Sequence, residues 1–217
     1  MRIDIWTDIV CPWCYIGKRR FERALETFAR RDEVQVVQRS YQLNPDAPLG
    51  VTSDRRAHLM SKYGWSEAQA EAMDANMERI AASEGLEYHL AGGLTGNTFD
   101  AHRIMHLGLD HGIQDAVVER LYRAYFTEQR SIFDHDSLAA LAAEAGLDQD
   151  EARRVLREHT YADAVTADLE EARSLRVNGV PFFVLDNKYA ISGAQSVEVF
   201  TEALEQASQL THAGTQA

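Results

Sequence analysis

The sequence is poor in cysteine, in proline and in long apolar runs. Only two cysteines and four prolines occur among its 217 residues. A secreted scaffold held by disulfides needs more cysteine pairs, spaced farther apart. No stretch approaches the roughly 20 apolar residues of a membrane helix, and Asp4 and Asp8 interrupt the apolar core that a secretory signal would need. We therefore expect a cytoplasmic protein with no membrane partner.

Positive charge is also scarce. The chain carries 22 Lys and Arg against 34 Asp and Glu, a formal net charge of −12. A field of this sign repels phosphate backbones, so we expect no nucleic-acid partner. The hydrophobic share of 45% and the charged share of 26% are ordinary for a globular protein.

The first 50 residues predict a strand, a helix and a second strand. Apolar and polar residues alternate over residues 2–8. Pro12 stands where a helix can begin, and an apolar stripe continues to about Arg31. A second strand follows over 34–41, and prolines and glycine at 44–50 then mark a boundary.

The remainder divides into a helical block and a second α/β segment. Residues 52–161 look all helical, with capping-box spacing at Ser66–Gln69 and Asp148–Glu151. A helix from Ala162, an apolar strand over 180–185, a short hairpin and a last helix follow. Residues after about Leu210 should fray.

This order predicts an α/β fold in which the two ends of the chain share one sheet. The expected domains are 1–45 and 162–217, which together form the α/β domain, and 46–161, a large all-helical insertion domain.

Cys11-Pro12-Trp13-Cys14 lies at the junction of the first strand and first helix. A thiol at a helix N-terminus faces unpaired N–H groups and the positive end of the helix dipole, which stabilise its thiolate. Cys14, one turn further on, lies on the same face and can close a small disulfide. We expect Cys11 to attack and Cys14 to resolve.

Two other interpretations of this pair remain open. Cys-x-x-Cys also begins zinc sites, but zinc needs about four ligands and there is no second pair. The alternative is two unreactive buried cysteines. His102 and His106 are spaced for a shared metal ion, yet a third ligand is missing nearby. We expect no metal.

Four motifs, in order along nearly the whole chain, resemble the FrnE-like branch of the DsbA family, which is related to 2-hydroxychromene-2-carboxylate isomerases. They are Asp8-Ile9-Val10-Cys11-Pro12-Trp13-Cys14-Tyr15-Ile16-Gly17, Asn97-Thr98-Phe99-Asp100-Ala101-His102, Gly179-Val180-Pro181-Phe182-Phe183 and Ile191-Ser192-Gly193-Ala194-Gln195. The resemblance implies a thioredoxin-like fold interrupted by a helical domain, and thiol–disulfide exchange as the activity.

The resemblance also implies that Pro181 is cis and packs beside the two thiols, with a substrate strand pairing against the backbone of Val180. An X–Pro bond alone has only about 5–6% odds of being cis. The alternative is a proline at the first residue of a strand. Pro12 and Trp13 between the thiols differ from the pairs in thioredoxin and bacterial DsbA, so the direction of the redox reaction stays open.

Four further residues are candidates, and structural alternatives exist for them. Asp8 could move a proton during exchange, or hydrogen-bond at the strand end. Trp13 could give substrate an apolar contact at an exposed loop position. Asn97 and His102 match the insertion motif of glutathione-dependent isomerases and kappa-type transferases; alternatively Asn97 caps a helix and His102 packs in the core.

The sequence therefore predicts an enzyme that exchanges disulfides with a protein or small-molecule substrate. No cofactor is expected, although glutathione or another small thiol could be a co-substrate. The alternatives are a glutathione-dependent isomerase or transferase of the kappa type, and a non-enzymatic chaperone-like binding protein.

Overall fold

The computed structural model describes the backbone of residues 1–213 and side chains up to residue 209. The chain forms two compact units: Met1–Tyr41 together with the chain from Asp168 onward, and Gln42–Ala167. The expected domain limits at residues 45 and 161 stay a prediction, because they concern which parts of the chain fold independently. The expected fraying after Leu210 concerns residues that lie mostly outside the described part.

The first unit is built on a four-stranded mixed sheet. Its strands are β1 (Arg2–Thr7), β2 (Gln35–Ser40), β5 (Phe182–Leu185) and β6 (Tyr189–Ser192), in the order β2-β1-β5-β6. β1 runs parallel to β2 and antiparallel to β5, and β5 and β6 form the expected hairpin. The two ends of the chain thus share one sheet, as the sequence predicted.

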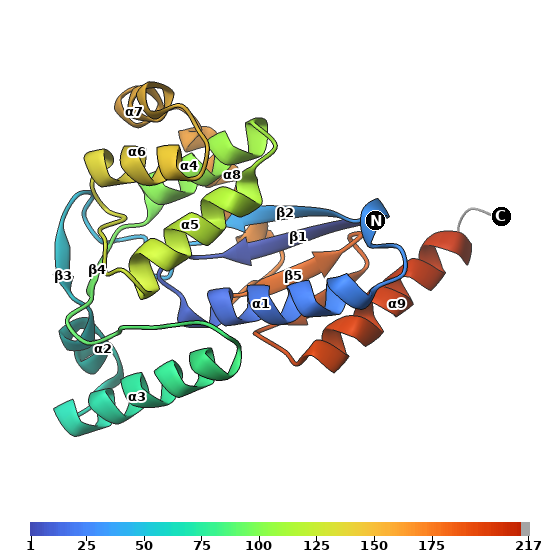
Figure 1. The fold of residues 1–217 in the computed structure, drawn as a ribbon, viewed down its shortest axis with the longest axis horizontal. Helices are drawn as coiled ribbons and strands as arrows, with labels where there is room; N and C mark the ends of the chain where they lie inside the picture. The colour runs from blue at the N-terminus through green and yellow to red at the C-terminus, as the bar shows by residue number, and fades with distance from the viewer. Residues whose placement is uncertain (214–217) are drawn as a thin grey trace. The chain divides into compact units, whose positions relative to one another are not determined.

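Alternation along β1 decides what each face of this sheet buries. Ile3 and Ile5 point to the face covered by α1 (Pro12–Thr27) and α9 (Val197–Ala213), which lie side by side in Figure 1. Asp4 and Trp6 point to the opposite face, since successive side chains of a strand alternate. There Trp6 packs with Ala172 and Val184 near the end of α8 (Ala162–Ser174).

α1 ends earlier than the sequence suggested. The apolar stripe predicts a helix to about Arg31, but α1 ends at Thr27, and one 3-10 turn, η1, occupies Arg31–Glu33. Phe28 has an extended backbone and is still buried in the core with Phe21. The side-chain stripe therefore continues past the residue at which the helix ends.

The second unit consists mainly of short helices. They are α2 (Arg55–Tyr63), α3 (Glu67–Ser83), α4 (Phe99–Asp110), α5 (Gln114–Phe126), α6 (His135–Glu144) and α7 (Gln149–Arg157), with the first residues of α8. Ser66 and Gln69 form the predicted capping box of α3. Asp148 caps α7 by accepting a hydrogen bond from the Glu151 N–H, at 2.7 Å.

The expectation of an all-helical insertion is wrong in one detail. β3 (Thr52–Asp54) and β4 (Leu94–Gly96) form a small antiparallel ribbon within this unit. Each strand has only three residues, and β3 is polar and exposed throughout. Strands this short show no alternation, so periodicity could not reveal them. Among the described residues, no helix is long and apolar enough to span a membrane.

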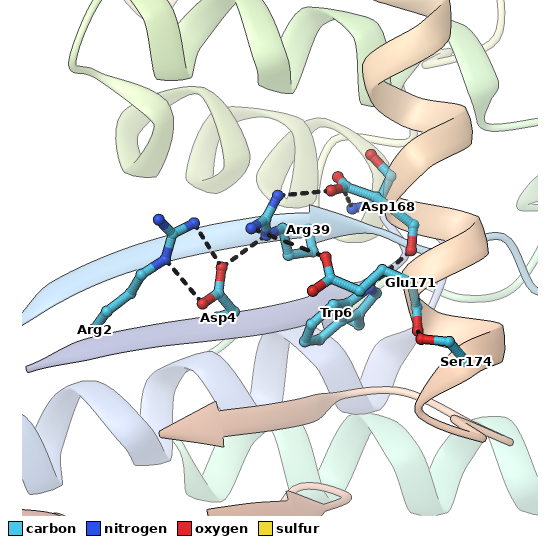
Figure 2. A network of polar contacts seen from close by, with 8 residues as sticks. Arg2, Asp4, Trp6, Arg39, Asp168, Glu171 and Ser174 are labelled. Carbon is cyan, nitrogen blue, oxygen red and sulfur yellow. Dashed lines mark hydrogen bonds and ion pairs between the residues drawn. The ribbon is translucent and has the colours of Figure 1, made fainter. Parts of the chain in front are cut away.

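A buried polar network holds β1, β2 and the middle of α8 together (Figure 2). Asp4 accepts hydrogen bonds from Arg2 and from Arg39, the latter at 2.7 Å. Arg39 also donates to Asp168 at 2.9 Å. The second carboxylate oxygen of Asp168 accepts from the Ser40 N–H at 2.8 Å. No periodic pattern in the sequence predicted this network.

Candidate active site

Cys11 is the N-cap residue of α1, at the strand-to-helix junction that the sequence predicted. Its backbone is extended, its N–H donates to the Asp8 carbonyl at 3.0 Å, and Pro12 begins the helix behind it. The thiol therefore lies where the first turn of α1 presents N–H groups without helical partners. The nucleophile in disulfide exchange is a thiolate, and this thiol is the one placed at the helix N-terminus.

Cys14 lies one turn inside α1, on the side that faces the sheet. It shares this side with Phe21 and Ala24, and it is buried. Burial raises the pKa of the Cys14 thiol well above its ordinary value, and the hydrogen bond and charge of Cys11 raise it further. Hydrogen bonds from the Thr7 side chain and the Asp8 backbone act in the opposite direction. The two cysteines are therefore in contact but differ in environment, and both are free thiols.

The loop before β5 provides the third part of the site. The Cys11 thiol donates to the carbonyl oxygen of Val180, with Sγ 3.4 Å from that oxygen. The Val180–Pro181 peptide bond is cis, as the resemblance implied. Pro181 and Val180 thus adjoin the pair of thiols, within the same unit of the chain.

Contacts with α1 and with the segment after β6 fix the position of this loop. The Gly193 N–H donates to the Pro181 carbonyl at 2.8 Å, and Arg20 of α1 donates to the Ala194 carbonyl at 2.7 Å. Gly17 lies between them: a Cβ added there would be 2.8 Å from Pro181 Cγ and 3.3 Å from the Ala194 Cβ. Gly17 therefore allows helix and loop to approach closely.

Replacing Gly17 by alanine is expected to destabilise the first unit, although alanine favours helices. The propensity gain is about 0.5–1 kcal/mol, whereas overpacking of a fixed contact costs about 1–3 kcal/mol. We expect a net loss of about 1 kcal/mol in urea unfolding. Gly179→Ala is the control, because nothing lies within 4 Å of its added Cβ. Equal stability of the two variants would contradict the contact.

Asp8 follows β1 directly and is almost fully buried, with 1% of its surface exposed. Its carbonyl accepts from the Cys11 N–H. The pKa of the Tyr41 hydroxyl is raised by burial and by the negative charge of Asp8, so this carboxylate acts on the end of β2 as well. Asp8 thus lies at the end of the strand, and both hydrogen bonding by its carboxylate there and its part in proton transfer stay predictions.

Trp13 is partly exposed, at 38% of its surface, beside the thiols. The sequence placed it in a loop, but it lies in the first turn of α1, because Pro12 already begins the helix. Its side chain is open to solvent, so contact with substrate stays a prediction for Trp13 as for Pro12.

Asn97 and His102 belong to the other unit. The Asn97 carbonyl oxygen accepts from Gln42 at 2.8 Å and from the Phe99 N–H at 2.9 Å, at the start of α4. Its amide donates to the carbonyls of Pro45 and Ala47. These hydrogen bonds give Asn97 a structural role. His102 is fully buried in α4. A role in binding stays a prediction for both residues.

Among the described residues, no group of three or more His, Cys, Asp or Glu is placed to hold a metal ion.

Three contributors to the site were not predicted from the sequence: Thr7, Gly17 as a packing residue, and Arg20. Thr7 continues the alternation of Ile3 and Ile5, which was the available signal. No local pattern predicts the contacts of Gly17 and Arg20, since their partners lie far along the chain.

Comparisons with known proteins agree with this geometry. Residues 2–205 match the family model of the DSBA-like thioredoxin domain. A probable DsbA oxidoreductase from Streptomyces coelicolor is 48% identical, with a TM-score of 0.92 over 95% of this chain and 89% of that one. The uncharacterised protein YwbO of Bacillus subtilis (strain 168) is 26% identical over 94% of this chain and 96% of its own.

A further solved structure shares the fold at lower identity. The cytosolic disulfide reductase DsbM from Pseudomonas aeruginosa is 17% identical, with a TM-score of 0.67 over 97% of this chain and all of that one. The thioredoxin-like fold with a helical insertion is thereby confirmed. The chain belongs to the DSBA-like thioredoxin domain family of thiol–disulfide oxidoreductases.

Proposed function

We propose that this enzyme exchanges disulfides through Cys11 and Cys14, with Cys11 attacking and Cys14 resolving. The observation that carries the proposal is the position of the Cys11 thiol, at the N-terminus of α1 and 3.4 Å from the Val180 carbonyl. Cys14 touches it from inside the helix and is held protonated by burial. Cys11 is thus the thiol placed to attack the substrate, and Cys14 stays protonated until the second step.

The reaction follows from this difference. Cys11 thiolate attacks one sulfur of a substrate disulfide, forms a mixed disulfide and releases the other substrate sulfur as a thiolate, which takes a proton from solvent. Cys14 then loses its proton and attacks Cys11 Sγ. The Cys11–Cys14 disulfide forms, and the second substrate thiol leaves. Two electrons pass from the enzyme to the substrate, and the reverse reaction oxidises dithiols.

The substrate is proposed to be a protein or a small-molecule disulfide that lies along the backbone of Val180 and against Trp13. The fold accommodates both kinds: DsbM from Pseudomonas aeruginosa has been solved with glutathione, and a DsbA from Proteus mirabilis with a non-covalently bound peptide. We propose reduction or isomerisation as the direction, with glutathione or another small thiol as co-substrate. A cytoplasmic location stays a prediction.

Equilibration in graded glutathione buffers tests the proposal. The free thiol count and tryptophan fluorescence should report one reversible two-electron transition that Cys11→Ser abolishes. Its midpoint separates a reductase, near about −270 mV, from an oxidant, near about −120 mV. If no disulfide forms between Cys11 and Cys14 across this range, the proposal fails.

The same variants separate the two alternatives. A glutathione-dependent isomerase or transferase would keep full activity towards small molecules in Cys14→Ser and show no disulfide chemistry in the wild type. A chaperone-like binding protein would prevent aggregation equally well after both cysteines were replaced by serine. The proposed enzyme loses catalytic turnover in both cases, and Cys14→Ser still forms a mixed disulfide through Cys11.

A further inference from the structure

Thr7 is the last residue of β1 and is almost fully buried, with 1% of its surface exposed. Its carbonyl accepts from the Tyr41 N–H at 2.9 Å, which continues the pairing of β1 with β2. Thr7 follows Ile3 and Ile5 in the alternation of the strand, so its side chain points to the face covered by α1. The backbone is held by the sheet and the hydroxyl lies beneath the first turn of α1.

The group above this hydroxyl is the second thiol. Cys14 lies on the sheet-facing side of α1, and the Thr7 side chain hydrogen-bonds to it. The Asp8 backbone N–H provides a second hydrogen bond to the same thiol. Both donors come from the end of β1, and both oppose the effect of burial on the pKa of Cys14. The strand therefore supplies two donors to a sulfur that the surrounding core would otherwise keep uncharged.

We propose that Thr7 is a positioning residue for the resolving step, whose hydroxyl donates to Cys14 Sγ and stabilises its thiolate for attack on Cys11. This inference rests on the proposed function and adds to it a control of the second half of the reaction. In that step Cys14 gives up a proton, the Cys14–Cys11 bond forms, and the bond from Cys11 to the substrate sulfur breaks. The departing thiolate takes a proton from solvent.

Thr7→Val removes the hydroxyl while keeping the shape of the side chain. At a pH below the pKa of Cys14, loss of this donor raises that pKa, and the thiolate fraction falls about tenfold for each unit of the rise. A more basic thiolate is also a better nucleophile. Its higher intrinsic rate offsets slightly less than half of the loss, when both are expressed as logarithms of the rate. From the strength of a hydrogen bond to a charged group, we expect resolution at pH 7 to slow about three- to tenfold.

The measurement is a stopped-flow reaction of the reduced protein with a substoichiometric amount of 5,5′-dithiobis(2-nitrobenzoate). The first nitrothiobenzoate released reports attack by Cys11, and the second reports resolution by Cys14. In Thr7→Val only the second phase should slow, with its pH profile displaced to higher pH. Thr7→Ser, which keeps the hydroxyl, should stay within about twofold of the wild type. Thr27→Val at the exposed end of α1 is the matched control, since its hydroxyl donates to the Ala24 carbonyl at 3.0 Å, within the same helix.

The titratable groups at the start of α1 and after β1 and β2 remain in Thr7→Val and in Thr7→Ser. They are Cys11 and Lys18 on α1, Asp8 after β1 and Tyr41 after β2. The loop before β5 adds none, because it contributes Val180 and Pro181. A displaced pH profile in Thr7→Val therefore reports the lost hydroxyl rather than a lost charge.

Two outcomes would overturn the inference. Resolution in Thr7→Val at the wild-type rate would show that the hydroxyl has no effect, and equal slowing in Thr7→Ser, which keeps the hydroxyl, would assign the effect to side-chain packing at position 7. If the wild type shows no second phase, the proposed function has failed. A second measurement then still tests the hydrogen bond: in the Cys11→Ala background, thiolate absorbance of Cys14 should titrate at higher pH with Thr7→Val than without it.

Discussion

A Cys14→Ser variant is expected to accumulate as a mixed disulfide between Cys11 and its substrate. The first half of the exchange needs only the Cys11 thiolate at the N-terminus of α1 and access beside Val180. The second half needs a thiolate at position 14, which a serine hydroxyl does not replace. Catalytic turnover should fall by at least about a thousandfold, because no thiol within the protein can attack the mixed disulfide and release the substrate.

The reciprocal variant distinguishes the two roles. Cys11→Ser leaves only Cys14, which is buried and kept protonated. We expect it to form no mixed disulfide on the timescale of Cys14→Ser. Intact-mass measurement after mixing with oxidised glutathione reports this, as one glutathionyl group gained by Cys14→Ser and none by Cys11→Ser. The opposite pattern would exchange the two roles.

The parts of the site that sequence could predict are those determined by neighbours along the chain. Cys11, Pro12 and Cys14 are adjacent to the end of a strand, and proline at the first helical position favours the helix that begins there. The same local reasoning located the hairpin and the capping box at Ser66. Short-range geometry is sufficient for each of these, because the partners are only a few residues apart.

The parts that sequence missed depend on contacts between distant segments. The close approach of Gly17 to Pro181 joins α1 to a loop more than 160 residues away. Such a glycine looks in the sequence like any other residue of a helix. The cis Val180–Pro181 bond was implied only by the resemblance, since its backbone has no local signal that separates it from the common trans form.

Thr7 is an intermediate case. Its place in the alternation of β1 predicts that it faces the core, where a hydroxyl needs a partner. The sequence could not name that partner, because it depends on how α1 lies over the sheet. A polar residue at a core-facing position beside a cysteine motif is therefore the signal to look for in a sequence. The structure is needed to identify the partner of that residue.

An Asp168→Ala variant is expected to lose about 3 kcal/mol of unfolding free energy. The carboxylate joins two groups that have few alternatives: the Arg39 guanidinium, 2.9 Å away, and the Ser40 N–H, 2.8 Å away. Ser40 is fully buried, so its N–H would lose its acceptor without gaining water. An orphaned buried donor costs about 1–3 kcal/mol, and breaking a buried ion pair costs about 3–5 kcal/mol.

The lower end of that range applies, because Arg39 keeps its bond to Asp4 and its side chain is 22% exposed. Asp168→Asn should cost less than Asp168→Ala, since an amide oxygen still accepts from Ser40. Glu171 is the control: its carboxylate is half exposed and 4.0 Å from Arg39, so Glu171→Ala should change stability by no more than about 0.5 kcal/mol.

Urea unfolding followed by far-UV circular dichroism measures these differences, and Trp6 adds a local probe. The indole N–H of Trp6 donates to the Asp168 carbonyl at 3.0 Å, so Trp6 fluorescence is sensitive to the contact between β1 and the middle of α8. If Asp168→Ala unfolds no more readily than Glu171→Ala, the network does not hold the helix to the sheet. The expected stability is lowest for Asp168→Ala, intermediate for Asp168→Asn and highest for the wild type, because the number of donors that keep an acceptor rises in that order. This order requires that this polar network, on the face of the sheet opposite α1, contributes to the stability on which the placement of the thiols depends.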